Sequence, residues 1–336
     1  MKAVFYSLFI VVIFVFAGCS TKFDINATPQ DITVVYGLLN QSDSTQYVKI
    51  TKAFLGESSA YEMAQDPSLS SYGNDLTVTL TEMYDGNTMR TITLQKSVVA
   101  NKDSGMFYYP NQEIYLFKPV PLLNAKYTYK LTVKNNTSNK LTTATTGMVN
   151  DFTVQKPAYN PGNPQIGFVG SNGDYSTNDA EWRSSLNGRI YEPLFRFHYR
   201  EVNKASLDTS SDKYVDWVLS SVTSETTAGG EDLTISYDGK SFYKLIQAKI
   251  PINTNVDRII GKVDFIISAG GDDLSIYIGL NKPTGSIVQE RPSYTNVTNG
   301  VGIFSCRFSK KYTYTLNQYS VNKLLNGEYT SQLGFK

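Results

Sequence analysis

The amino-acid sequence predicts a mainly β protein, with an immunoglobulin-like β-sandwich followed by a second β-rich domain that contains one or two short helices. Three observations lead to this fold class. Apolar and polar residues alternate over many short segments, which is the period of a half-buried strand. Turn-forming residues separate these segments. The 336-residue chain holds 24 Tyr and 17 Phe, and aromatic residues favour strands.

The first half of the chain reads as successive strands joined by turns. Leu76, Val78 and Leu80 alternate with threonines, and the Asp-Gly-Asn turn at 85–87 predicts a hairpin. A helical turn is predicted at 60–65, inside a long polar loop. Many short alternating strands predict an immunoglobulin-like sandwich over residues 31–150, although the Cys…Trp…Cys pattern of true immunoglobulins is absent. Strands are predicted at 32–39, 46–54, 76–81, 92–94, 113–117, 127–133 and 141–146.

Pro157, Pro161 and Pro164 predict a linker or a stiff crossing loop near 149–165. The β-rich domain that follows, 151–336, is more mixed. A helix is predicted at 241–249 from the helical spacing of its apolar residues, and another near 321–325, ended by Gly327. A long hairpin is predicted from 263–267, through a turn at 269–273, back along 274–280. Further strands are predicted at 194–202, 214–219 and 301–308.

The first residues have the layout of a bacterial lipoprotein signal peptide. Met1 and Lys2 precede a 15-residue apolar run, AVFYSLFIVVIFVFA, and Gly18 and Cys19 follow at once. Such a run is too short to span a bilayer comfortably. We therefore expect residues 1–18 to be removed, Cys19 to carry acyl chains, and residues 19–30 to form a lipidated tether. A plain signal peptide with an incidental cysteine is the alternative.

The overall charge favours neither nucleic acid nor an acidic surface as partner. Lys and Arg number 31, and Asp and Glu number 30, so no strong field of one sign is expected. The two cysteines are Cys19 and Cys306. If Cys19 is acylated, Cys306 has no disulfide partner, and its alternation with Phe304 and Phe308 predicts a buried thiol.

Arg196, His198 and Arg200 form the sharpest polar feature, because alternation places all three on one face of the strand at 194–202. Together they are a candidate contact for an anionic ligand. Cross-strand ion pairs with neighbours such as Asp216 are the simpler explanation. His198 is the only histidine, and its position in mid-strand between two arginines argues against catalysis.

Other candidate sites are less specific. Tyr108, Tyr109 and Trp182 fall in predicted loops and are a candidate aromatic platform for a sugar ring. The acidic pairs Asp272-Asp273 and Asp208…Asp212 lack the spaced ligands of a calcium loop and are explained by turn preference. No nucleotide-binding, metalloprotease or nucleophile-elbow motif occurs in the sequence. We therefore predict no catalytic residue, no metal and no cofactor.

Several segments resemble a group of uncharacterised, strand-rich envelope lipoproteins of the Bacteroidota that carry a domain of unknown function. The resemblance rests on VYGLLNQSDSTQYVKITKAFLG, on EPLFRFHYREV with KYVDWVL, and on PSYTNVTNGVGIFSCRF at 292–308. It implies a family-specific β-rich second domain and a role near outer-membrane receptors, and it supplies no catalytic residues. The acidic run that follows the lipidated cysteine in many surface-exported lipoproteins of this phylum is missing, so the periplasmic and cell-surface faces both stay open.

The sequence therefore predicts a non-enzymatic protein, anchored in the outer membrane by acyl chains on Cys19, that acts as a binding or scaffold module of an outer-membrane complex. Its expected partners are the membrane and an outer-membrane protein. A glycan-binding accessory lipoprotein is one alternative, and an aromatic platform would favour it. A carboxylate-based hydrolase is another, and it requires two carboxylates that meet in a cleft.

Overall fold

The computed structural model describes residues 31–53, 59–100, 111–282 and 293–336. The protein is mainly β, with 48% strand and 15% helix, which confirms the predicted fold class at that level. The described residues form a ten-stranded, a five-stranded and a three-stranded sheet, together with five α-helices. The helices are α2 (Ala60–Gln65), α3 (Pro67–Ser70), α4 (Gly239–Lys249), α5 (Asp272–Asn281) and α6 (Gln318–Asn326), and η1 (Ser331–Leu333) is a 3-10 turn.

The ten-stranded sheet contains strands from both halves of the chain. Its path is β13 (Lys213–Val218), β12 (Ile190–Asn203), β16 (Val256–Gly270), β18 (Gly300–Leu316), β1 (Thr33–Leu39), β2 (Gln46–Lys52), β6 (Gln112–Phe117) and β5 (Gln95–Val99). Two short strands lie off this path: β10 (Gln165–Ile166) pairs with β18, and β14 (Val222–Thr223) pairs with β12.

The two smaller sheets each pack against one part of the large sheet. The five-stranded sheet runs β17 (Val297–Thr298), β8 (Leu141–Thr146), β7 (Thr128–Asn135), β3 (Leu76–Tyr84) and β4 (Asn87–Thr93). The three-stranded sheet runs β15 (Asp232–Asp238), β11 (Thr177–Arg183) and β9 (Val154–Lys156). We call the half built on β1 and the five-stranded sheet the first lobe, and the half built on β12, β16 and the three-stranded sheet the second lobe.

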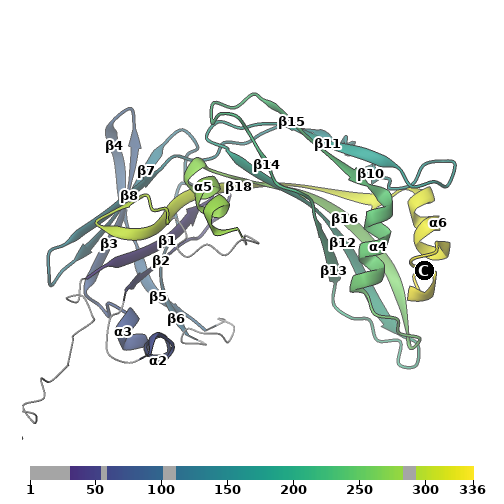
Figure 1. Cartoon of the computed structure of the whole chain (residues 1–336), viewed down its shortest axis with the longest axis horizontal. Helices are drawn as coiled ribbons and strands as arrows, with labels where there is room; N and C mark the ends of the chain where they lie inside the picture. Colours follow the sequence, from purple (N-terminus) through teal and green to yellow (C-terminus); the bar gives the residue numbers. More distant parts are fainter. Residues whose placement is uncertain (1–30, 54–58, 101–110, 283–292) are drawn as a thin grey trace, which may run out of the picture.

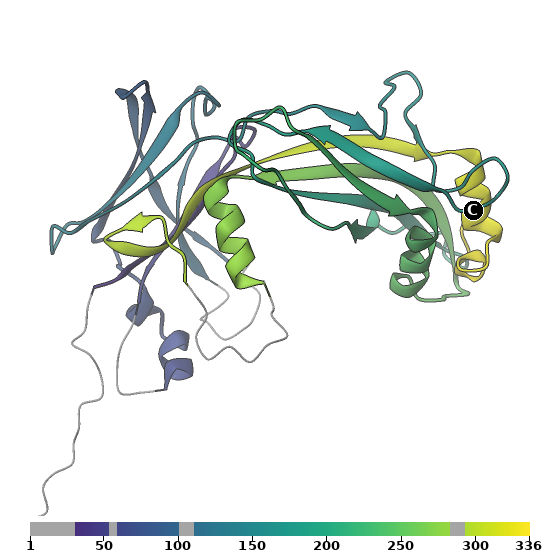
Figure 2. The ribbon, with the colours of Figure 1, turned by 45° about the horizontal axis from the view of Figure 1, so that its top comes forward.

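Strand β18 runs through both lobes. Its first part, 300–306, pairs in parallel with β1, and its second part, 307–314, pairs antiparallel with β16. The lobes consequently form an arch, visible in Figures 1 and 2, with β18 spanning its top. The sequence division near residue 150 is therefore crossed, because residues 297–306 complete the sheets of the first lobe. Met148, Val149 and Phe152 are buried, so the predicted linker is packed at its start.

Gly302 makes the parallel pairing of β1 and β18 possible. Its φ of +111° is one that other residues rarely adopt, and a Cβ placed there would lie 2.0 Å from the carbonyl oxygen of Val35. The predicted hairpin at 76–94 is confirmed: β3 pairs with β4, and its turn uses positive φ at Asp85 and Gly86.

The second lobe has an aromatic core on one face of its sheet. Phe195 and Phe197 of β12 are buried there, as their alternation predicts, and Phe168 stacks on Phe242 of α4 with ring centroids 4.1 Å apart. The predicted helices at 241–249 and 321–325 are confirmed as α4 and α6. Figure 1 shows α4 and α6 on the same side of the sheet, which leaves its other face open to solvent.

The predicted hairpin at 263–280 is wrong in its second half, because 272–281 form helix α5. The apolar residues 274, 276, 278 and 280 alternate like a strand, but none of them is buried. Asp272 and Asp273 lie in the first turn, where carboxylates stabilise the positive end of a helix. The second half of the chain therefore has three α-helices in its described residues, where one or two were expected.

Candidate functional site

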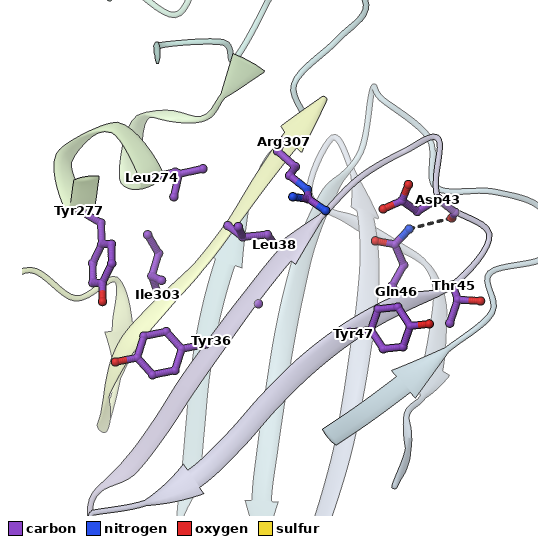
Figure 3. A pocket seen from close by; sticks show the side chains of 11 residues that line it. Tyr36, Leu38, Asp43, Thr45, Gln46, Tyr47, Leu274, Tyr277, Ile303 and Arg307 are labelled. Atoms are coloured by element: carbon purple, nitrogen blue, oxygen red, sulfur yellow. Dashed lines mark hydrogen bonds between the residues drawn. The ribbon is translucent and has the colours of Figure 1, made fainter. Parts of the chain in front are cut away.

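A groove lies on the outer face of the first lobe, between strands β1 and β2 and helix α5. It has a volume of about 410 Å³ and is lined by eleven residues from β1, the β1–β2 loop, β2, α5 and β18. We call it the tyrosine groove, because Tyr36, Tyr47 and Tyr277 all line it; Figure 3 shows these three side chains around its wall.

Strand alternation turns the first two tyrosines outward. Val35, Leu39 and Val48 point into the core of the first lobe and are fully buried. Tyr36 and Tyr47, on the opposite phase, are 43% and 53% exposed.

Helix α5 supplies the third tyrosine. Gly271, which precedes the helix, donates its backbone N–H to the Cys306 carbonyl of β18 at 3.1 Å. This bond fixes the start of the helix beside the sheet. The Tyr277 ring then meets the Tyr36 ring edge-on, with centroids 6.5 Å apart. Partial burial, together with the hydrogen bond to Tyr277, raises the pKa of Tyr36, so its phenol stays neutral at pH 7.

The β1–β2 loop at one end of the groove is held by a buried glutamine. The Gln46 side chain accepts from Asn40 N–H at 3.0 Å and donates to the carbonyl oxygens of Asn40 and Asp43 at 2.7 and 2.8 Å. One carboxylate oxygen of Asp43 accepts from Asn40 Nδ2 at 3.2 Å. The loop is therefore ordered in the same shape with or without a ligand.

Arg307 supplies a positive charge on the β18 side of the groove. Its side chain is exposed and makes no ion pair within the described residues. In Figure 3 its guanidinium group lies across β1 from Asp43. The only carboxylate among the lining residues is Asp43. A glycosidase needs two carboxylates, so the groove does not have the geometry of the hydrolase alternative.

The structure places Arg196, His198 and Arg200 on one face of β12, as predicted, but on the open face of the second lobe. Arg196 donates two hydrogen bonds to Asp216, at 2.7 and 2.8 Å, and lies 4.1 Å from the ring centroid of Tyr214. Its charge is therefore already balanced across the strand pair. Arg200 is exposed.

His198 is held between two carboxylates. Its Nδ1 lies 2.5 Å from Asp212 and its Nε2 lies 3.2 Å from Asp264. Burial acts to raise the pKa of Asp264, but a 2.6 Å hydrogen bond from Thr313, the Lys311 charge and His198 together hold that pKa below its usual value. The cluster links three strands of the sheet, and it accounts for the only histidine as a structural residue.

The predicted aromatic platform is corrected in part. Trp182 lies in β11, is fully buried and packs on Tyr191 with centroids 5.9 Å apart. A buried indole has no face to offer a sugar, so Trp182 is a core residue. Its burial follows from strand alternation in β11, where Ala180 is also buried. Tyr108 and Tyr109 lie outside the described residues, as does Cys19.

The remaining candidates have structural explanations. Asp272 lies 3.4 Å from Arg189 in an ion pair, and Asp273 accepts a hydrogen bond from the Tyr294 hydroxyl. Within the described ranges no three His, Cys, Asp or Glu residues gather as metal ligands do. Cys306 is buried as predicted, and burial raises the pKa of its thiol to about 11, which makes it a poor nucleophile.

No family model matches this chain, and no curated protein matches it either. The resemblance to Bacteroidota envelope lipoproteins therefore stays a prediction. Among the described helices, none combines the length and the apolar character that crossing a bilayer requires. The arguments that follow depend on the geometry alone.

Proposed function

We propose that this chain is a non-enzymatic lipoprotein of a Gram-negative outer membrane, related to the Bacteroidota group that it resembles. Acyl chains on Cys19 anchor it, and it acts as a binding or scaffold module of an outer-membrane complex. The first lobe is, in this proposal, an immunoglobulin-like sandwich. The partner is an outer-membrane protein, and the proposal holds for either face of that membrane.

The observation that carries this proposal is the outer edge of the ten-stranded sheet in the second lobe. Strand β13 ends the sheet and pairs with β12 on one side only. Its Tyr214 and Val218 side chains are 55% and 65% exposed. An unpaired strand edge with exposed apolar side chains is a template for a strand from another protein.

The architecture supports a scaffold role because it holds this edge away from the anchor. The tether at 19–30 leads into β1 of the first lobe and spans at most about 40 Å when fully extended. Strand β18 is hydrogen-bonded along both lobes. The second lobe therefore keeps a fixed orientation to the first, and β13 lies at the opposite end of the sheet from β5 (Figure 1).

The test is co-purification of the full-length lipidated protein from its native membrane in mild detergent, with mass spectrometry of the bound proteins. We expect a stoichiometric outer-membrane protein with the wild type, and its loss with Val218→Lys. Val98→Lys is the matched control, because Val98 is 58% exposed on β5, the other edge strand of the same sheet.

Two results would overturn the proposal. If the wild type purifies alone, the protein is not a scaffold. If Val98→Lys removes the partner and Val218→Lys does not, the partner docks on the other edge, and the role assigned to β13 is wrong. Intact mass spectrometry of the same sample tests the anchor, since the proposal requires an acylated N-terminus at Cys19.

A further inference from the structure

We propose that the tyrosine groove binds an uncharged carbohydrate. This inference goes beyond the scaffold role and does not depend on it, because the groove lies on the first lobe and the proposed docking edge on the second. It assigns to Tyr36, Tyr47 and Tyr277 the contacts that Tyr108, Tyr109 and Trp182 were predicted to make.

The first argument is the chemistry of the exposed rings. A pyranose ring has apolar C–H faces and a rim of hydroxyl groups. A tyrosine that is half exposed offers a flat apolar ring face and a hydroxyl group at its edge. Tyr36 and Tyr47 have this exposure, and they flank the same hollow. Tyr277 closes one side through its edge-on contact with Tyr36.

The second argument is the set of polar groups between the rings. Asp43 accepts a hydrogen bond from Asn40 at Oδ1, and Oδ2 of the same carboxylate makes no hydrogen bond to a described residue. Arg307 presents guanidinium donors without an ion-pair partner in the described part of the chain, and Thr45 adds a hydroxyl group. An acceptor facing several donors suits a sugar, whose hydroxyl groups both donate and accept.

The third argument is charge. Asp43 and Arg307 are the charged side chains that line the groove, and they carry opposite signs. The groove therefore has no net charge with which to select a phosphate, a sulfate or an acidic peptide. Its hydrogen-bonding groups are nevertheless directional, and this combination favours a neutral ligand with many hydroxyl groups.

The fourth argument is size and rigidity. A volume of about 410 Å³ lies within the range of small-ligand pockets, and it suits one or two sugar rings. A protein partner usually covers about 800 Å² on each side, which is far more than this hollow offers. The walls are paired strands, and Gln46 holds the loop. Binding therefore needs little reorganisation.

The test uses the full-length protein in a zwitterionic detergent that has no sugar headgroup. The protein is applied to an array of neutral hexose and hexosamine oligosaccharides, with uronic-acid oligosaccharides printed beside them. The best binder is then titrated by calorimetry. We expect binding to neutral oligosaccharides, with no preference for the uronic-acid ones.

Three variants assign the binding to the groove. Tyr47→Ala should weaken it about tenfold, which is the loss of one stacked ring. Tyr47→Phe, which keeps the ring, should retain most of the affinity. Tyr319→Ala is the matched control, because Tyr319 is 46% exposed on α6 in the second lobe, and it should bind like the wild type. Thermal unfolding of each variant checks that it is folded.

The proposal is overturned if no array sugar binds, or if Tyr47→Ala binds as tightly as Tyr319→Ala. It is also overturned if uronic-acid oligosaccharides alone bind, because the groove then selects an anion. If Tyr47→Ala instead removes the co-purified membrane protein while no sugar binds, the groove belongs to a protein interface. Loss of that partner with Val218→Lys alone leaves the sugar result to stand by itself.

Discussion

Replacing Gly302 by alanine tests whether β18 joins the two lobes into one cooperative body. At φ +111° an alanine is strained, and its Cβ would lie 2.0 Å from the Val35 oxygen and 2.9 Å from the Val35 carbonyl carbon. Backbone strain of this kind costs about 1–3 kcal/mol. Pushing β18 away from β1 adds about 1–3 kcal/mol of overpacking. We expect Gly302→Ala to lower the free energy of unfolding by at least about 2 kcal/mol.

The assay exploits the position of the two tryptophans. Gly302 pairs with β1 in the first lobe, whereas Trp182 and Trp217, the only tryptophans, lie in β11 and β13 of the second lobe. Urea unfolding is followed by tryptophan fluorescence and, in parallel, by circular dichroism. We expect both midpoints to fall together, because the strand that is disturbed in one lobe also pairs with β16 in the other.

Gly279→Ala is the matched control. Gly279 lies in α5, and a Cβ placed there meets no atom within 4 Å. Alanine should therefore stabilise the protein by up to about 1 kcal/mol through helix propensity. The reasoning is refuted if Gly302→Ala leaves stability unchanged. It is also refuted if the dichroism midpoint falls and the fluorescence midpoint does not, since the lobes then unfold independently.

Three further predictions concern buried polar groups. Because the folded-state pKa of Asp264 lies below its usual value, the ionised carboxylate stabilises the fold above about pH 4. That contribution is lost as pH falls through the folded pKa, so unfolding free energies should fall less steeply with pH in Asp264→Asn. Cys306, with its thiol pKa raised to about 11, should react with a thiol reagent at pH 8 only after denaturant is added. Arg258 is fully buried and binds Glu201 at 2.9 Å and the Pro251 carbonyl at 2.9 Å; Arg258→Ala should cost about 3 kcal/mol in urea titrations.

Much of the fold follows from local sequence patterns. The outward phase of Tyr36 and the inward phase of Phe195 are set by alternation alone, and the Asp85-Gly86 turn by its positive φ requirement. Helix α5 was predicted as a strand because its apolar residues recur at every second position as well as along a helix. Trp182 was assigned to an exposed loop because the short strand β11 has a mixed, polar sequence.

The tyrosine groove and the shared strand could not be predicted, because both depend on pairings between residues far apart in sequence. Tyr36 and Tyr47 are near neighbours in the chain, but Tyr277 and Arg307 come from its last quarter. Only the parallel pairing of β1 with β18 brings them together. The outward phase of Tyr36 and Tyr47 was the one local signal, and it gave no reason to expect a hollow between them.

The most direct test of the proposed scaffold role is site-specific photo-crosslinking in living cells. A photoreactive phenylalanine analogue replaces Tyr214 on the edge strand β13, and in a control strain it replaces Tyr84, which is similarly exposed on β3 of the other sheet. The account predicts one crosslinked outer-membrane protein from position 214 and none from position 84. Crosslinks from position 84 alone, or from neither position, would contradict it.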